Sequence, residues 1–231
     1  MTERHEDGFP ARAFTKLLRL NEGLIQPLER PLLGWLAARM PAWVTPDLLT
    51  ALGFAGAAVA FVAYAASPAW PALLWLASLG ILLNWFGDSL DGNLARYRRI
   101  ERPRYGFFLD HSVDVLNNLM ICLGLGLAPG VRFETACLAL IGYFMLTILT
   151  FIRTNVMNTL QISFIGIGPT ELRIAVIGLN ALLFFGVPPL VEWRAPLTIV
   201  DLLLLLWFAG TVVFFVAMLL IELPRLRRDD P

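Results

Sequence analysis

Six apolar runs follow one another after residue 46, and short polar or proline-containing breaks separate them. The stretch Leu48–Gly87 contains no charged side chain, and Ser67-Pro-Ala-Trp-Pro71 divides it into two runs. Each run is near the ~20 residues that a helix needs to cross a bilayer, and backbone groups in lipid must be satisfied within the helix. The pattern predicts an all-α polytopic membrane protein with six transmembrane helices, at about 47–66, 71–92, 106–127, 135–152, 172–187 and 198–221.

A more polar segment precedes these runs. From about Ala11 to Met40, apolar residues recur with helical spacing, but charged residues interrupt them too often for a membrane span. We predict an N-terminal amphipathic helix at the membrane surface, although a helix packed against the cytoplasmic side fits the same pattern. Pro27 and Pro31 are expected to break this helix into pieces. Because Met1–Asp7 is charged and lacks an apolar core, no cleavable signal peptide is expected.

The basic residues are distributed unevenly between the two sides of the predicted bundle. Of the 18 lysines and arginines, all but Arg132 and Arg194 fall in the N-terminal segment, the second and fourth connections or the C-terminal tail. The positive-inside rule therefore places both termini and the 93–105 loop in the cytoplasm, and we expect a prokaryotic inner membrane. The chain divides into an interfacial segment 1–46, a membrane domain 47–221 and a basic cytoplasmic tail 222–231.

Composition removes several classes of function. The formal net charge is +0, so charge gives no indication of a nucleic-acid partner. With 2 cysteines and 2 histidines, the chain has too few of either for a disulfide framework or a Cys/His metal site. Hydrophobic residues make up 58% of the sequence, which agrees with burial in lipid.

Four aspartates interrupt the apolar pattern at the cytoplasmic ends of the second and third predicted spans, where a carboxylate is costly. Asp88 and Asp91 are three residues apart and Asp110 and Asp114 four apart, so each pair lies on one face of its helix. Because the two helices are consecutive and antiparallel, their acidic faces can converge. Oxygen ligands without His or Cys select Mg²⁺, Mn²⁺ or Ca²⁺, and one carboxylate could serve as general base for a hydroxyl.

Small residues and one arginine accompany the aspartates. Gly92, Ala95 and Gly106 lie on or beside the acidic faces and leave room for a ligand close to the backbone. Arg96 offers a planar fork suited to phosphate oxygens. Divalent metal, arginine and cleared space together indicate a pyrophosphate site and the transfer of a phosphoryl group.

The run D-x₂-D-G-x₂-A-R-x₉-G-x₃-D-x₃-D resembles the signature of the class I CDP-alcohol phosphotransferase (CDP-alcohol phosphatidyltransferase) family. Its fixed positions are all matched, by Asp88, Asp91, Gly92, Ala95, Arg96, Gly106, Asp110 and Asp114. The resemblance implies metal-dependent transfer of a substituted phosphate group from a CDP-linked donor to an alcohol, with release of CMP, in phospholipid biosynthesis. It also implies a homodimer.

The resemblance assigns roles to the motif residues. It implies a centre of two ions, Mg²⁺ or Mn²⁺, held by Asp88, Asp91, Asp110 and Asp114, with Asp114 as the catalytic base. The CDP site would be lined by Asp91, Gly92, Ala95, Arg96 and Gly106. A weaker likeness at Val44–Thr50 adds Pro46 and Thr50, although Asp47 stands where asparagine is common. Pro46-Asp47 also fits the start of a helix.

The acceptor is left open by the sequence. Some family members use CDP-diacylglycerol with a small polar alcohol, and others use CDP-choline or CDP-ethanolamine with diacylglycerol. Asp110-His111 and Thr170-Glu171 resemble the second branch. Arg153, Glu171 and Arg173 lie around the fourth connection and would face the same cytoplasmic cavity, where the two arginines could bind an acidic acceptor or a lipid phosphate. Together with His111 they form the predicted acceptor or lipid site. Alternatively, His111 packs between helices, and the two arginines set topology and pair with Glu171.

Two other classes of protein compete with the enzyme. A cation transporter would use the aspartates as an acidic filter, but the aspartates lie at one membrane face and not along a pore. A non-catalytic membrane scaffold could retain a decayed motif, but every fixed position is intact. Both observations favour the transferase.

Overall fold

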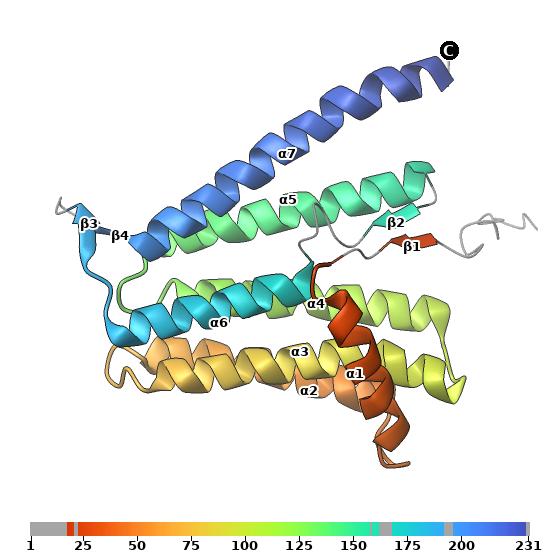
Figure 1. Ribbon diagram of the computed structural model, residues 1–231, viewed down its shortest axis with the longest axis horizontal. Helices are drawn as coiled ribbons and strands as arrows, with labels where there is room; N and C mark the ends of the chain where they lie inside the picture. The colour runs from red at the N-terminus through yellow and green to blue at the C-terminus, as the bar shows by residue number, and fades with distance from the viewer. Residues whose placement is uncertain (1–17, 21–22, 158, 162–167, 192–195, 230–231) are drawn as a thin grey trace, which may run out of the picture.

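The computed structural model describes residues 18–20, 23–157, 159–161, 168–191 and 196–229 (Figure 1). Within these residues the chain forms long helices joined by short connections, with two small strand pairs at the edges. The helices are α1 (Gln26–Arg39), α2 (Pro46–Ala66), α3 (Leu73–Arg98), α4 (Pro103–Leu125), α5 (Phe133–Met157), α6 (Pro169–Phe185) and α7 (Ile199–Asp229). The strands are β1 (Leu18–Leu20), β2 (Thr159–Gln161), β3 (Pro189–Val191) and β4 (Leu197–Thr198).

Each predicted span coincides with one helix, from α2 to α7. Among the described helices, α2, α3, α5 and α7 are long and apolar enough to cross a membrane, which supports an integral membrane protein of all-α class. Helix α4 is more polar because it contains Asp110 and Asp114. Helix α6 has 17 residues, or about 26 Å of helical rise. Six crossings therefore remain a prediction.

Helix α3 is longer than the sequence pattern indicates. It continues past the expected end at residue 92 to Arg98 and closes with Arg99 in the left-handed region, at φ 58°. The connection to α4 is therefore confined to residues 99–102. As a result, Asp88, Gly92 and Ala95 all lie on one continuous helix.

The N-terminal segment differs from the expected helix over 11–40. Residues 18–20 form β1, which pairs in parallel with β2, and α1 begins only at Gln26. The remainder of the predicted helix before residue 23, 11–17 and 21–22, lies outside the described residues. The prediction of helix at 18–20 was therefore wrong. A local apolar pattern could not show that these residues pair with β2, a strand that follows α5 far along the chain.

The prolines of α1 do not break it. Pro27 occupies the first turn, where its missing N–H is not needed. Pro31 lies inside the continuous helix. Leu33 and Ala37 bury themselves in a cluster with residues of α2 and α3, and this packing holds α1 together despite the hydrogen bond that Pro31 cannot make.

Helices α2 and α3 pack unusually closely because glycines line their contact. A Cβ added to Gly56 would lie 2.6 Å from the backbone of Asn84 and Gly80, so no larger residue fits there. Asn84 Nδ2 also donates to the carbonyl of Gly53 across the contact, at 3.0 Å. The close contact fixes the acidic end of α3 against the first turns of α2.

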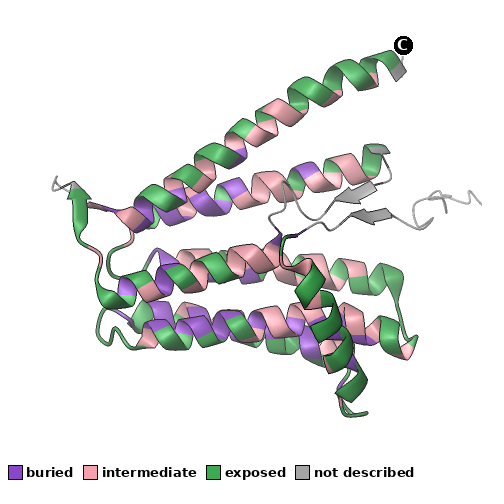
Figure 2. Ribbon diagram, in the orientation of Figure 1, coloured by how far each residue is buried: buried purple, intermediate pink, exposed green. Residues whose placement is uncertain are grey.

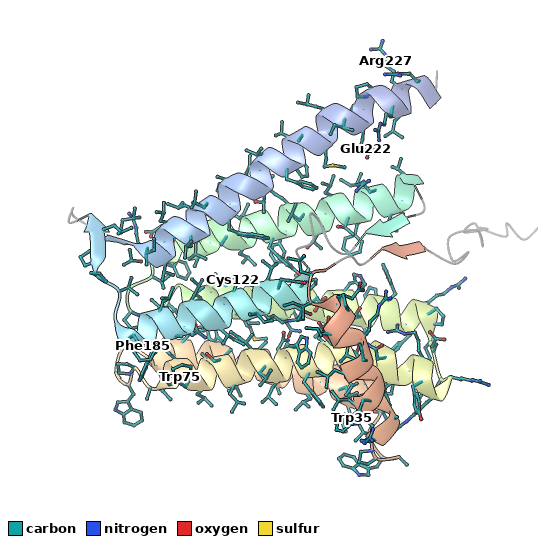
Figure 3. The ribbon with its side chains drawn as sticks, viewed as in Figure 1. Trp35, Trp75, Cys122, Phe185, Glu222 and Arg227 are labelled. Atoms are coloured by element: carbon teal, nitrogen blue, oxygen red, sulfur yellow. The ribbon has the colours of Figure 1, made fainter. Side chains whose placement is uncertain are left out.

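The exterior of the bundle is largely apolar. Helix α7 leaves α5 at an angle towards its C-terminal end (Figure 1), and most of its surface is exposed or half-buried (Figure 2). Exposed aromatic residues lie in both halves of the bundle, with Trp75 and Phe185 near one end and Trp35 on α1, which crosses the bundle in its other half (Figure 3). This arrangement is typical of proteins whose ends lie at the two membrane interfaces.

Candidate active site

Three of the four predicted aspartates converge between α3 and α4. One carboxylate oxygen each from Asp88, Asp110 and Asp114 lies within 4.8 Å of the other two. Asp114 Oδ1 is buried and has no hydrogen-bond partner among the described residues. Burying an anionic oxygen without a hydrogen-bond donor is unfavourable in free energy. The all-oxygen composition of the cluster and this unpartnered oxygen are both typical of a site for a hard cation.

Asp91 lies on α3, as Asp88 does, but its side chain faces α2. Its Oδ2 accepts a hydrogen bond of 2.6 Å from Thr50 Oγ1, and the carboxylate is nearly buried. It therefore lies outside the three-carboxylate group in this structure. Its role as a metal ligand stays a prediction.

The guanidinium group of Arg173, on α6, contacts the aspartate cluster. Arg173 Nη2 lies 2.7 Å from Asp88 Oδ2, and Arg173 Nε donates to Asn84 Oδ1 at 3.0 Å. Sequence reasoning did not select Asn84, although it precedes Asp88 by one helical turn and lies on the same face. A polar residue in a charge-free apolar run was the available indication.

The alternative in which the two arginines pair with Glu171 is wrong. Arg173 pairs with Asp88, and Arg153 Nη2 pairs with Glu222 Oε1 of α7 at 3.2 Å. Glu171 instead accepts hydrogen bonds from the backbone N–H groups of Gly168 and Ile25, both at 2.9 Å. Glu171 thus caps the start of α6, where an acidic residue also complements the helix dipole.

A pocket between α2, α3 and the start of α4 contains every residue predicted to bind the nucleotide. Its lining includes all seven of them: Pro46, Thr50, Asp91, Gly92, Ala95, Arg96 and Gly106. Asp110 also lines it, which joins the pocket to the aspartate cluster. A Cβ added to Gly106 would meet nothing within 4 Å, and one added to Gly92 would meet only the Arg96 guanidinium. These glycines therefore leave space that a ligand can occupy.

The rim of this pocket carries an ion pair. Asp47 pairs with Arg102, whose guanidinium carbon lies 4.3 Å from the centre of the Tyr105 ring. Thr45 caps α2 by accepting from the Leu48 N–H, so the interpretation of Pro46-Asp47 as a helix start is confirmed. Asp47 has both roles, in the first turn of α2 and on the pocket rim.

His111 packs between α4 and α5. Its ring stacks on Phe107 with centroids 4.1 Å apart and lies 5.3 Å from the Phe151 ring. Its Nδ1 is 2.9 Å from the Phe107 carbonyl oxygen and 3.4 Å from Asp110 Oδ2. These contacts fit the packing alternative, and contact of His111 with an acceptor stays a prediction.

A second, apolar cavity of about 260 Å³ lies between α4, α5, α6 and α7. Its polar lining residues are Arg173, Asn118 and Tyr143, and Arg173 also contacts Asp88. The rest of the lining is almost entirely apolar and includes Leu125, Leu204 and Trp207. The aspartates thus have the predicted nucleotide pocket on one side and an apolar cavity on the other.

Comparison with known proteins agrees with this architecture, which is that of an all-α membrane protein with a carboxylate cluster beside a pocket lined by the motif residues. Residues 43–224 match the model of the CDP-alcohol phosphatidyltransferase family, and the chain belongs to that family. The predicted family is therefore confirmed, and the predicted class of enzyme is the one that this family name describes.

Relatives of known function fall in more than one branch of the family. Cholinephosphotransferase 1 of Danio rerio is 29% identical over 182 residues, which cover 73% of this chain and 45% of that protein. Archaetidylinositol phosphate synthase of Pyrococcus horikoshii is 32% identical over 132 residues, 57% of this chain and 64% of that protein. Phosphatidylinositol phosphate synthase of Cutibacterium acnes is 35% identical over 111 residues, 45% and 51% respectively. The chain spans about half the length of the cholinephosphotransferases it matches.

Proposed function

We propose that this protein transfers a substituted phosphate group from a CDP-linked donor to the hydroxyl of an acceptor and releases CMP. The observation that carries the proposal is the convergence of Asp88, Asp110 and Asp114 beside a pocket that contains all the residues predicted for the nucleotide. Membership of the CDP-alcohol phosphatidyltransferase family supports it. A cation filter would need acidic residues along a pore, and the cluster instead borders a pocket.

The carboxylate cluster fits divalent metal. Its donors are all oxygens, and Asp114 Oδ1 lacks a partner, so we propose Mg²⁺ or Mn²⁺ held by Asp88, Asp110 and Asp114, with Asp91 completing a centre of two ions. Bound metal would neutralise the diphosphate and the departing CMP. Arg96 would contact the diphosphate from the same helix, and Gly92 and Ala95 would let it approach the backbone.

In the proposed reaction, the acceptor oxygen forms a bond to the phosphorus that carries the donor alcohol. The bond from that phosphorus to the oxygen bridging it to CMP breaks, and CMP departs with the bond electrons. Asp114 would take the proton of the acceptor hydroxyl with the carboxylate oxygen that does not bind metal.

We further propose that the acceptor is a lipid with one hydroxyl, of the diacylglycerol type, and that the donor is CDP-choline or CDP-ethanolamine. The apolar cavity supports this direction, because two of its polar lining residues contact the aspartates: Arg173 pairs with Asp88, and Asn118 Nδ2 donates to the backbone carbonyl of Asp114. A hydrocarbon chain would fill the apolar part and place the hydroxyl at the polar end. The similarity to cholinephosphotransferase 1 agrees.

The competing direction uses CDP-diacylglycerol and a small polar alcohol. Similarity to the two inositol phosphate synthases favours it. It would require cationic groups for an acidic acceptor, but in this structure Arg153 and Arg173 are already paired with Glu222 and Asp88. Direct contacts of Arg153 and Arg173 with an acidic acceptor belong to this alternative, whereas contacts of His111 and Glu171 with the acceptor stay a prediction for either direction.

The proposed setting is a prokaryotic inner membrane. We propose that all six helices from α2 to α7 cross it, that both termini and the active site are cytoplasmic, and that the protein is a homodimer. The division into an interfacial segment 1–46, a membrane domain 47–221 and a basic tail 222–231 belongs to the same proposal. The distribution of basic residues and the exposed aromatic residues in both halves of the bundle support it.

The test is CMP release by the purified full chain in lipid nanodiscs. CDP-choline or CDP-ethanolamine is supplied with diacylglycerol, and CDP-diacylglycerol with glycerol 3-phosphate, serine or inositol phosphate, each with Mg²⁺ or with chelator. We expect Mg²⁺-dependent CMP release with the first pairing. Release only with the second would reverse the direction, and no release from folded protein with any pairing would refute the transferase.

One variant tests the cavity separately. Ala175 lines the cavity and is exposed, so Ala175→Leu should narrow it without displacing packed neighbours. We expect a higher KM for diacylglycerol and an unchanged KM for the CDP donor. A change confined to the donor would contradict the assignment of the cavity to the lipid acceptor.

A further inference from the structure

A single carboxylate oxygen on α1 connects three helices. Glu29 Oε1 accepts hydrogen bonds from Trp85 Nε1 at 2.8 Å and from Ser89 Oγ at 3.3 Å, both on α3. The same oxygen accepts from Thr170 Oγ1 of α6 at 2.9 Å. Hydrogen bonds to a charged acceptor are stronger than neutral ones, so Glu29 holds α3 and α6 at a fixed separation.

The donors to Glu29 flank the residues of the aspartate cluster. Trp85 lies three residues before Asp88, and Ser89 follows it directly. Thr170 lies three residues before Arg173, on the same face of α6. The Asp88–Arg173 ion pair therefore spans the same two helices that Glu29 joins, about one turn away.

The start of α1 is also fixed to α6 through its backbone. Glu171 Oε1 accepts from the N–H of Ile25, and Glu171 Oε2 from that of Gly168. A Cβ added to Gly23 would lie 2.8 Å from Glu171 Oε1, so the chain passes very close to this carboxylate. These contacts set the position of the first turn of α1, and hence the direction of the Glu29 side chain.

We infer that Glu29 is a positioning residue: by joining α1 to α3 and α6, it sets the orientation of Asp88 and Arg173 at the reaction centre. The inference rests on the proposed function for its catalytic consequence. Glu29 is not close to the aspartates in sequence and belongs to none of the motif positions. It acts on the metal-binding cluster through other residues, as outer groups around metal sites commonly do.

The variants are made in the full chain in nanodiscs. Glu29→Ala removes the acceptor, Glu29→Gln keeps a carbonyl oxygen in its place, and Thr170→Val removes only the link to α6. Glu134→Ala is the matched control, because Glu134 is an exposed acid in the first turn of α5 whose ion pair with Arg132 is long, at 3.8 Å.

Three quantities are measured: hydrogen exchange of peptides covering 85–89 and 168–173, the Kd for Mn²⁺ without substrate, and the kcat for CMP release. For Glu29→Ala we expect faster exchange in both peptides, Mn²⁺ binding about tenfold weaker and a kcat about tenfold lower. Thr170→Val should change in the same direction by less, whereas Glu29→Gln should stay within about threefold of wild type. Glu134→Ala should match wild type in all three.

The readouts separate failure of this inference from failure of the proposed function. Faster exchange with unchanged Mn²⁺ affinity and kcat would mean that Glu29 only stabilises the fold, and the inference would be overturned while the transferase stands. Unchanged exchange would overturn the connection itself. If wild type releases no CMP, the transferase and the catalytic role of Glu29 both fall, while exchange still reports whether Glu29 joins the helices. Should Glu29→Ala fail to fold, Thr170→Val and Ser89→Ala supply the same comparison.

Discussion

Arg173 of α6 donates to Asp88 of α3 across 2.7 Å, and both side chains are mostly shielded from solvent. The pair brings a positive charge to a cluster of three carboxylates. Without a cation, these carboxylates would repel one another and be poorly solvated. Arg173 therefore stabilises the cluster, and any divalent ion that binds Asp88 shares that carboxylate with it.

Arg173→Met is predicted to make the protein depend on metal for stability. Removing one partner of a shielded ion pair costs about 3–5 kcal/mol, because Asp88 is left beside Asp110 and Asp114 without its cation. Mg²⁺ should restore part of this loss, so the rise in Tm on adding Mg²⁺ should be larger in the variant than in wild type. Thermal unfolding with chelator and with Mg²⁺ measures it.

Arg153→Met is the matched control for this prediction. It breaks the ion pair with Glu222 between α5 and α7, and neither residue belongs to the aspartate cluster. Its Tm should fall equally with and without Mg²⁺. Equal Mg²⁺ shifts in wild type and Arg173→Met would show that Arg173 and the metal act independently.

Asp114→Asn is predicted to abolish turnover and leave much of the metal binding in place. Asparagine keeps one oxygen as a ligand but cannot take the proton of the acceptor hydroxyl. Loss of a general base typically lowers kcat by about 10²–10⁴-fold. Single-turnover CMP release gives the rate, and Mn²⁺ binding without substrate gives the affinity. Turnover at the wild-type rate would exclude Asp114 as the base.

The helices and the convergence of three of the four aspartates could be predicted because both depend on local spacing. Apolar runs define α2 to α7, and the spacing of four residues places Asp110 and Asp114 on one helix face, beside Asp88. The spacing of three residues did not bring Asp91 to the cluster, because its side chain faces Thr50 of α2. The end of α3 was placed too early, because the charged residues after Gly92 look like a loop when hydropathy alone is considered. The helix continues there and ends at Arg98.

The partners of the charged side chains could not be predicted in this way. Arg173 and Asp88 are 85 residues apart, and their contact depends on how α6 packs against α3. Glu29 met the criteria for an ordinary surface acid, because its donors on α3 and α6 come from distant parts of the sequence. The pairing of β1 with β2 was missed for the same reason, since Leu18 and Leu20 fit a helix or a strand equally well.

Arg98→Lys is predicted to weaken binding of the CDP donor without altering metal affinity. The Arg98 guanidinium donates to the carbonyl groups of Met40, Pro41, Ala42 and Val44 in the connection between α1 and α2. It thus holds the start of α2, which forms one wall of the nucleotide pocket. Lysine cannot form this planar set of hydrogen bonds.

The expected result for Arg98→Lys is a several-fold higher Kd for CDP, on the order of 1 kcal/mol, with an unchanged Kd for Mn²⁺. Arg99→Lys, at the neighbouring position, is the control and should bind CDP like wild type. If both variants lose CDP affinity equally, the effect comes from the basic character of the loop and not from the hydrogen bonds of Arg98.

Gly106→Leu is predicted to block the nucleotide pocket without destabilising the fold. Gly106 lies in the first turns of α4, a Cβ there would meet nothing within 4 Å, and the residue lines the pocket. A leucine side chain would therefore enter the ligand space and not a packed neighbour. Replacing glycine within a helix should even add about 0.5–1 kcal/mol of stability.

Gly178→Leu is the matched control, because a Cβ at Gly178 on α6 also meets nothing within 4 Å and the residue does not line the nucleotide pocket. Both variants should keep or raise the Tm of wild type. Only Gly106→Leu should lose CDP binding in a Mg²⁺ titration. Retained CDP affinity in that variant would place the nucleotide elsewhere, because the side chain would occupy the space that Gly106 leaves open beside Asp110.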